Sequence, residues 1–529
     1  MKKILVSFAL AVTLAAGFSS CSDFLEQPVL GQENLDTYFQ NEEECLKQVN
    51  GCYQSIAYDD WWQIYKFYIA TDMCTDDMWM GNTTQDAGEY RDLAHYTGNG
   101  QTNCPQNYWQ YRYKGILRCN VVIANVPEAP ITNETLRARM IAEAKFLRAF
   151  QYFELVNYFG GIPIVLNMAM PEEIQGITRS SVEEVYAQIE KDLTEAIPDL
   201  PKRSEYAASD MGRITKGAAQ GLLGKAYLFQ EKYTQAEEVL NTVISSGEYE
   251  LLPEFGDVWS IETNNSKEGL FEIQTNSDLT YNLGERISVV CGSRDDAGWS
   301  WGLPTSNLEK AFLDAGDTER LKWTIIKHNA TEVPGDPTWT AENPYIITPD
   351  KHKSGRVTRK LYIPMDQRPS PYDASHIPLN YRLLRYADVL LMYAEVENAL
   401  GKDEAARDAL NKVRHRAKLD DVQAAGKDLR DAIRLERRLE LALENQRLFD
   451  LRRWKDDNGK KAICNIMGPN GTFVKYNLEE STDEWEKVNQ KENSNKGYYF
   501  REDRDLLFPI PFSEVSMSQG SITQNPNYN

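Results

Sequence analysis

Two stretches decide the fold class: GLLGKAYLFQEKYTQAEEVLNTVI (residues 221–244) and LLMYAEVENALGKDEAARDALNKVRHRA (residues 390–417). They share one pattern, in which a small residue (Gly224 or Ala394) is followed twelve residues later by an alanine and then by a leucine and a valine. Small residues at these positions let two antiparallel helices approach each other closely. Each stretch therefore predicts a tetratricopeptide-like helical hairpin. Because the two copies lie far apart, they do not form a tandem array, and generic helix pairs remain the alternative.

Other parts of the chain also predict helices, because apolar residues recur there at three- and four-residue spacing. These helices span residues 41–56, 106–126, 133–159 and 180–200. The third ends at Gly160, which is typical of a helix C-cap. The fourth begins with Ser180 and Glu183, which have the spacing of a capping box.

The middle of the chain, residues 249–380, is rich in Gly, Pro, Asn, Asp and Trp and contains only short apolar runs. We expect loops, short strands and one helix at 307–313 there. Long irregular stretches in a compact protein usually carry function. The predicted fold is thus mainly α, with a loop-rich, partly β insertion.

The N-terminus predicts an export signal. Lys2 and Lys3 precede an apolar run, residues 4–16, which is shorter than the roughly 20 residues that a membrane-spanning helix needs. The run leads into FSSCSDFLEQP, where Cys21 follows two serines as in a bacterial lipobox, although Phe18 stands where leucine is usual. We expect a signal peptide over residues 1–20 and lipidation of Cys21. Ordinary cleavage near Ser20 is the alternative.

Composition excludes some partners. The formal net charge of −21 and the lack of a basic patch argue against nucleic acid. No C-x-x-C pair occurs, which argues against a zinc site, and no D-x-D-x-D-G calcium loop is present. We predict no metal site and no cofactor, and a structural Ca²⁺ in the acid-rich loops is the alternative. Seven cysteines remain beyond Cys21, an odd number, and we expect buried free thiols.

The sequence contains no familiar catalytic motif. The pairs Asp76-Asp77 and Asp295-Asp296 consist of neighbouring residues, which rarely face the same bond as a glycosidase requires. We found no H-E-x-x-H, G-x-S-x-G or P-loop. We therefore predict a protein that is not an enzyme, with a surface glycoside hydrolase as the alternative from a different class.

Aromatic residues in loops are the main binding candidates. Large rings flanked by Gly and Asp, off any helical stripe, tend to be exposed, and sugar rings stack on such faces. The candidates are Trp79, Tyr281, Trp299 and Trp301. Asn82, Asp77 and Arg294 are candidates for hydrogen bonds to sugar hydroxyls. The alternative is that these tryptophans fill the junctions between loops and helices.

The segment 433–454 is dense in arginine and glutamate. We interpret it as a structural helix with i,i+4 ion pairs, such as Arg434 and Arg438 against Glu436 and Glu440. A site for an anion or a partner is the alternative.

Several blocks together resemble the SusD/RagB family of Bacteroidetes outer-membrane lipoproteins. They are CSDFLEQP (21–28), FELVNYFGGIPIVL (153–166), YRLLRYADVLLMYAEVENALG (381–401) and LLFPIPFSEVSMSQGSITQNPNY (506–528). The resemblance spans nearly the whole chain after residue 20.

The resemblance implies one SusD-like domain over residues 21–529, with an N-terminal part at about 22–240 and a C-terminal part at about 250–529. It implies a surface-exposed protein that captures oligosaccharides and passes them to a SusC-like TonB-dependent transporter. Some members bind peptides, which is the alternative within the family. Trp79 with Asn82, and the segment from Tyr281 to Trp301, look similar to the arc of ring side chains with which the founding member holds its glycan.

Overall fold

The computed structural model describes residues 38–57, 61–81, 88–168, 176–352, 354–488 and 495–528. The signal peptide, Cys21 and Asn82 lie outside these residues. The helices of the first half are α2 (Glu42–Ala57), α3 (Trp61–Met73), α4 (Gly88–His95), α5 (Asn103–Asn125), α6 (Glu134–Phe159), α8 (Val182–Ala196), α9 (Lys216–Phe229) and α10 (Tyr233–Ser245). Those of the second half are α11 (Ile287–Cys291), α12 (Ser306–Asp314), α13 (Thr318–Thr324), α14 (Tyr386–Ala399), α15 (Asp403–Arg416), α16 (Gly426–Glu440), α17 (Arg447–Arg453), α18 (Ile463–Ile466), α19 (Thr472–Lys475), α20 (Glu484–Val488) and α22 (Phe512–Met517). The predicted, mainly α fold class is confirmed.

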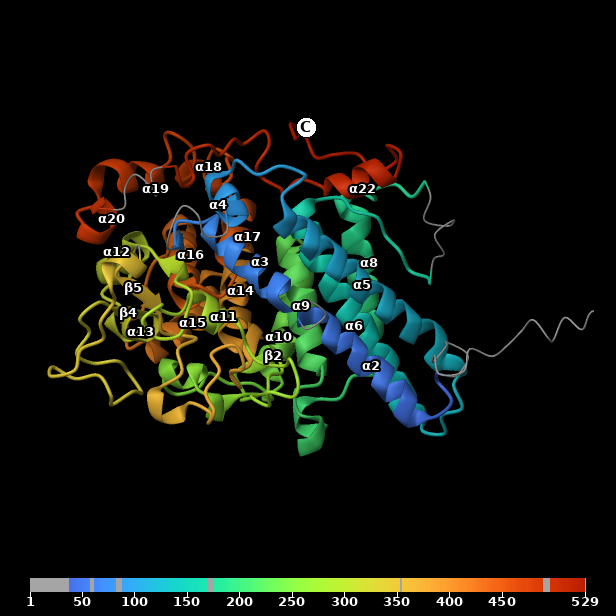
Figure 1. Cartoon of the computed structure of the whole chain (residues 1–529). Coiled ribbons are helices and arrows are strands. Elements are labelled where there is room, and N and C mark those ends of the chain that lie inside the picture. The colour runs from blue at the N-terminus through green and yellow to red at the C-terminus, as the bar shows by residue number, and fades with distance from the viewer. Residues whose placement is uncertain are drawn as a thin grey trace, which may run out of the picture.

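The long helices pack side by side in an array. Figure 1 shows α2, α5, α6 and α8 at one end, α9 and α10 in the centre, and α14 to α16 toward the other end. The α9–α10 and α14–α15 pairs are the two hairpins predicted from sequence. A Cβ added to Gly224 would lie 2.5 Å from a methyl carbon of Leu240, so only glycine allows this approach of α9 and α10. Ala394 and Ala406 are both fully buried between α14 and α15.

Most helix ends follow the predicted signals. Gly160 ends α6 with a φ of 78°, as a C-cap glycine does. The start of α8 is one residue later than predicted, because Ser181 and Glu184, not Ser180 and Glu183, form the capping box. At α2 the side chain of Asn41 accepts a hydrogen bond from the amide of Glu44.

The strands form three separate antiparallel pairs. The strands are β1 (Met78–Gly81), β2 (Gly269–Ile273), β3 (Trp301–Pro304), β4 (Ile325–Lys327), β5 (Arg356–Thr358) and β6 (Tyr381–Arg385). β1 pairs with β3, β2 with β6 and β4 with β5. The predicted helix at 307–313 is α12. The short helices α11 and α13 were not predicted, since five to seven residues are too few to show periodicity.

The arginine- and glutamate-rich segment is structural, as interpreted, but its ion pairs were predicted wrongly. A helix ends at Glu440 and a second one starts at Arg447. Arg438 and Glu436, which were predicted to pair along one helix, reach other parts of the chain instead. Arg438 binds Asp77, and Glu436 binds Arg320 and Arg414.

Glu440 is the centre of this buried ion-pair network. Its carboxylate contacts Arg385 at 2.5 Å, Arg320 at 3.0 Å and Arg416. Burial alone would raise the pKa of Glu440, but the guanidinium groups of Arg416, Arg385 and Arg320 outweigh burial and lower it. The network joins α13, β6, α15 and α16 in the core of the second half.

The described cysteines form no disulfide, as expected from sequence. Cys45, Cys52, Cys74, Cys104, Cys119 and Cys291 are buried thiols, and Cys464 is half-buried. None of the helices in the described ranges combines the length and apolarity that crossing a bilayer requires.

Candidate functional site

Four aromatic rings gather where α3, α4 and β3 meet, and we call them the tryptophan cluster: Trp62, Tyr90, Trp299 and Trp301. Trp62 and Trp299 are stacked, with ring centroids 4.6 Å apart and planes 15° apart. Trp301 lies edge-on to Trp299 at 5.4 Å and tilted to Tyr90 at 5.8 Å. The three tryptophans are half-buried, so each keeps part of its surface in solvent. The cluster therefore combines packing with exposed ring surface.

Two cations lie against these rings. The Lys66 ammonium is 5.4 Å from the ring centroid of Trp62 and 5.6 Å from that of Trp299. The Arg286 guanidinium carbon lies 4.2 Å from the centroid of Trp62. Such contacts contribute on the order of 0.5–1 kcal/mol each at exposed sites. They hold the rings in a fixed arrangement.

The backbone around Trp299 and Trp301 is fixed by β1 and α11. Trp301 pairs with Gly81 in the β1–β3 register. The Trp299 amide donates to the carbonyl of Val289 at 2.8 Å. Arg294 donates from Nε to the Trp299 carbonyl at 3.0 Å, so this predicted ligand residue also shapes the loop that carries Trp299.

The prediction that Trp79 is exposed is wrong. Its side chain is 1% exposed, and its indole N–H donates to Glu486 at 2.9 Å. Its ring packs on Phe473 at 5.7 Å. Trp79 lies in strand β1, and Phe473, Glu486 and Lys496 contact its side chain. Trp79 therefore offers no ring face to a ligand in this structure.

Asp77 is also not available to a ligand, which corrects its predicted role. It is 1% exposed, and its Oδ1 accepts hydrogen bonds from Arg438 at 2.6 and 2.9 Å. Burial raises the pKa of Asp77, against the lowering effect of Arg438. Its neighbour Asp76 accepts two bonds from Arg447. These aspartates attach β1 to α16 and α17.

Tyr281 has the exposure that was predicted. Its side chain is 58% exposed, in a loop closed by a hydrogen bond from the Asn276 amide to the Leu283 carbonyl at 2.8 Å.

The second carboxylate pair, Asp295 and Asp296, is bound within the protein. Asp295 contacts Lys351, and Asp296 receives two hydrogen bonds from Arg368 at 2.6 and 2.7 Å.

Sequence reasoning missed Trp62, Tyr90, Lys66 and Arg286. Trp62 and Lys66 stand four residues apart in DDWWQIYKFY, so they share one face of α3. That i,i+4 pair, directly after two aspartates, is a signal that could have pointed to the cluster.

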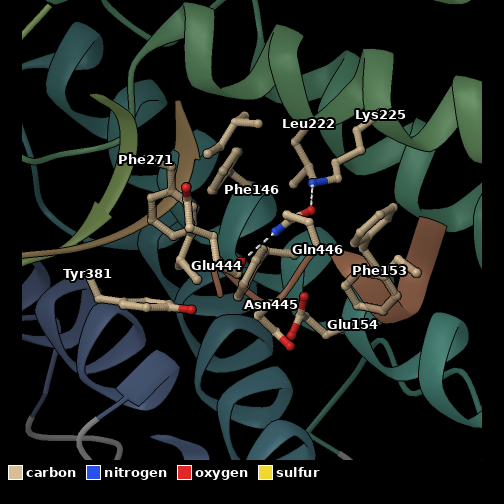
Figure 2. Close-up of a pocket in the computed structure, with 14 residues that line it drawn as sticks. Phe146, Phe153, Glu154, Leu222, Lys225, Phe271, Tyr381, Glu444, Asn445 and Gln446 are labelled. Atoms are coloured by element: carbon tan, nitrogen blue, oxygen red, sulfur yellow. Dashed lines mark hydrogen bonds between the residues drawn. The ribbon is translucent and has the colours of Figure 1, made fainter. Parts of the chain in front are cut away.

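An interior cavity with several polar groups, shown in Figure 2, is a further concave feature of the described residues. It has a volume of about 30 Å³, which is space for a water molecule and not for a sugar. Lys225 donates to the side-chain oxygen of Gln446 at 2.5 Å and to Asp388 at 3.0 Å. Burial raises the pKa of Glu154 on the opposite wall. The hydrogen bond between Lys225 and Gln446 links α9 to the turn before α17, and the small volume leaves no room for a sugar.

Comparisons with known proteins identify the family of this chain. The model of the SusD family matches residues 262–528, about half of the chain. The chain belongs to the SusD family. A second model, described as starch-binding associating with outer membrane, matches residues 23–228. The resemblance predicted from sequence is thus confirmed.

Individual relatives agree with this. SusD-like protein P2 of Formosa agariphila is 26% identical over 555 residues, covering both chains completely. The starch-binding protein SusD of Bacteroides thetaiotaomicron is 26% identical over 242 residues, 43% of this chain and 40% of that protein. A solved structure titled laminarin-binding SusD-like protein superimposes with a TM-score of 0.73 at 26% identity, covering 92% of this chain and 100% of that one.

Proposed function

We propose that this SusD-family protein captures oligosaccharides at a cell surface without cleaving them, and that the tryptophan cluster is its binding platform. The observation that carries the proposal is the set of half-buried rings, Trp62, Trp299 and Trp301, which pack against one another where α3, α4 and β3 meet. The names of relatives that bind starch and laminarin support a glycan as the ligand class.

The mechanism follows from the geometry of the rings. A sugar presents an apolar C–H face, which stacks on an indole ring, and hydroxyl groups, which accept or donate hydrogen bonds at the ring edges. Each stacking contact contributes on the order of 1 kcal/mol. Because Lys66 and Arg286 hold the rings in place, little conformational entropy is lost on binding. The affinity for a short glycan is then in the micromolar range or weaker, on the order of 1 μM for −8 kcal/mol.

The proposal includes delivery to a transporter. A single SusD-like domain, tethered to the outer membrane through lipid on Cys21, would hold the glycan at the mouth of a SusC-like TonB-dependent barrel. Stable tethering needs more than one acyl chain, which a diacylglyceryl group supplies. Radiolabelled palmitate incorporated into the wild type but not into Cys21→Ala would support the anchor.

Isothermal titration with laminarihexaose, maltohexaose and xylohexaose tests the binding platform. We expect wild type to bind at least one, and Trp299→Ala to weaken that binding about fivefold, the equivalent of about 1 kcal/mol. Trp339→Ala is the control, because this half-buried tryptophan packs on Tyr345 and not on the cluster. Equal affinities for wild type and Trp299→Ala would remove the cluster from the site. Release of reducing ends from these sugars would overturn the non-catalytic assignment.

A further inference from the structure

A second concave site lies near the tryptophan cluster. It is a pocket of about 410 Å³ between α2, the segment 209–213 before α9, and strand β2 with the residues that follow it. Neither its residues nor its position was predicted from sequence. Its volume exceeds that of the interior cavity by more than tenfold and is large enough for a small organic ligand.

The lining of this pocket is amphipathic. Ile56, Phe271 and Ile273 are buried and form its floor. Asn50, Gln54 and Ser209 are exposed and stand at its mouth. An apolar floor with amide and hydroxyl groups at the rim suits a ligand with both an apolar face and many hydroxyls. A saccharide residue has this character.

Glu272 supplies a buried acceptor at the inner end. Its side chain is 5% exposed, and its Oε2 accepts from the Asn265 amide and from Asn380, both at 2.9 Å. Within the described part of the chain, Oε1 has no hydrogen-bond donor, and its nearest cation is Arg382 at 3.9 Å.

The unused oxygen of Glu272 lies beside Gly269, where a small cavity of about 20 Å³ adjoins the pocket and shares Met211, Gly212 and Arg213 with it. That volume holds one water molecule, which can link Oε1 to a ligand hydroxyl. A buried acceptor of this kind favours a ligand rich in hydroxyl donors.

The pocket and the tryptophan cluster are neighbours along two segments of the chain. Leu283 lines the pocket, and Arg286, three residues later, lies on the ring of Trp62. Three residues span at most about 10 Å. Ile56 in the pocket also precedes Trp62 by six residues. The exposed Tyr281 is two residues from Leu283, at the edge of the same region.

From these contacts we propose that the pocket is a second saccharide site, which holds one end of the oligosaccharide that stacks on the tryptophan cluster. The assignment rests on the proposed glycan-binding function. It explains why Tyr281 and Trp299 both offer exposed ring surface although they stand on different loops. One chain of sugars reaches from the pocket, past Tyr281, to the stacked pair Trp62–Trp299.

The test is to block the mouth of the pocket without disturbing the fold. Gln54→Cys is made in a Cys464→Ala background, so that the only exposed thiol among the described residues is at the pocket mouth, and is labelled with N-cyclohexylmaleimide. The same protein is titrated before and after labelling with laminarihexaose and maltohexaose and with the corresponding trisaccharides. We expect labelling to weaken hexasaccharide binding at least tenfold, to the level of the trisaccharide.

Lys47→Cys, labelled in the same way, is the matched control, since it is exposed on α2 and does not line the pocket. Its hexasaccharide affinity should equal that of the unlabelled protein. Unchanged affinity of labelled Gln54→Cys, with binding still sensitive to Trp299→Ala, would overturn the second site and leave the proposed function intact. If the unlabelled protein binds neither these sugars nor xylohexaose, the proposed function fails and the second site fails with it.

Discussion

Gly81 determines where Trp301 lies. It has a φ of 135°, which side chains rarely adopt, and a Cβ added to it would lie 2.5 Å from the carbonyl oxygen of Ser300. The clash is with backbone, so it cannot be relieved by a rotamer change. Ser300 itself has a positive φ of 57° and joins Trp299 to Trp301. The placement of both tryptophans therefore depends on one glycine.

Gly81→Ala should lower the free energy of unfolding by about 1–3 kcal/mol, the strain of a disfavoured backbone conformation. It should also weaken glycan binding, because β3 moves with Trp301. Gly51→Ala is the matched control, since Gly51 lies in α2 with no atom within 4 Å of an added Cβ. The control should be neutral or stabilise by about 0.5–1 kcal/mol. Chemical denaturation of both variants measures these changes in the free energy of unfolding.

Asp72 should make stability depend on pH. Burial raises its pKa to about 8, and one hydrogen bond, from the Asn445 amide at 3.1 Å, only partly offsets this. The folded state therefore keeps a proton that the unfolded state loses above about pH 3.9. The stability that this proton contributes is complete below pH 3.9 and is lost as pH rises to about 8.

Asp72→Asn keeps the acceptor for Asn445 but removes the titration. Between pH 5 and pH 8 the wild type should lose stability relative to this variant, by up to about 1.4 kcal/mol per pH unit. Denaturant unfolding at both pH values measures the difference. Parallel stability curves for the two proteins would contradict the prediction.

Which single residues could be predicted depended on how local their environment is. Exposure of Tyr281 follows from its polar, glycine-containing loop. Burial of Trp79 could not be inferred, because Phe473 and Glu486, which cover it, stand about 400 residues further along the chain. The expectation that Trp79 lies in a loop failed for the same reason, because the strand that contains it, β1, pairs with residues 301–304 far along the chain.

At the scale of elements, helix pairs are specified by short-range patterns. The contact between Gly224 and Leu240 illustrates this, because a glycine in one helix and a fully buried leucine in the next set the distance between α9 and α10. Both lie in one stretch of sequence, so the hairpin was predictable. The pockets were not, since each is lined by elements that are distant in the chain.

A double-mutant cycle tests whether Gly224 and Leu240 contribute to stability through their shared contact. Leu240→Ala should destabilise by about 2–5 kcal/mol, because it removes a fully buried side chain. Gly224→Val overpacks the same contact at a cost of about 1–3 kcal/mol. The double variant should lose less stability than the sum of the two single losses, with a coupling energy of about 0.5–3 kcal/mol. Strict additivity in denaturant unfolding would show that the two positions do not share a contact.

Across the whole molecule, the buried charges link parts that the helical array alone does not join. Glu440 at the end of α16 contacts Arg320 of α13, Arg385 of β6 and Arg416 of α15. The sequence showed that this segment is rich in both charges, but the partners stand up to 120 residues away and only the folded chain identifies them.

Glu440→Gln should therefore lower the stability of the entire second half of the chain. Removing one charge from a buried set leaves three guanidinium groups facing an amide, and such losses cost about 3–5 kcal/mol. Because the folded pKa of Glu440 is lowered, its stabilising effect is present above about pH 4.3, the unfolded value, and is lost at lower pH. The denaturation midpoints of wild type and Glu440→Gln should thus be far apart at pH 7 and converge as the pH falls below 4. Glu43→Gln, which removes an exposed i,i+4 partner of Lys47, should leave the midpoint unchanged. Equal midpoints for Glu440→Gln and Glu43→Gln at pH 7 would show that the network does not hold the molecule together.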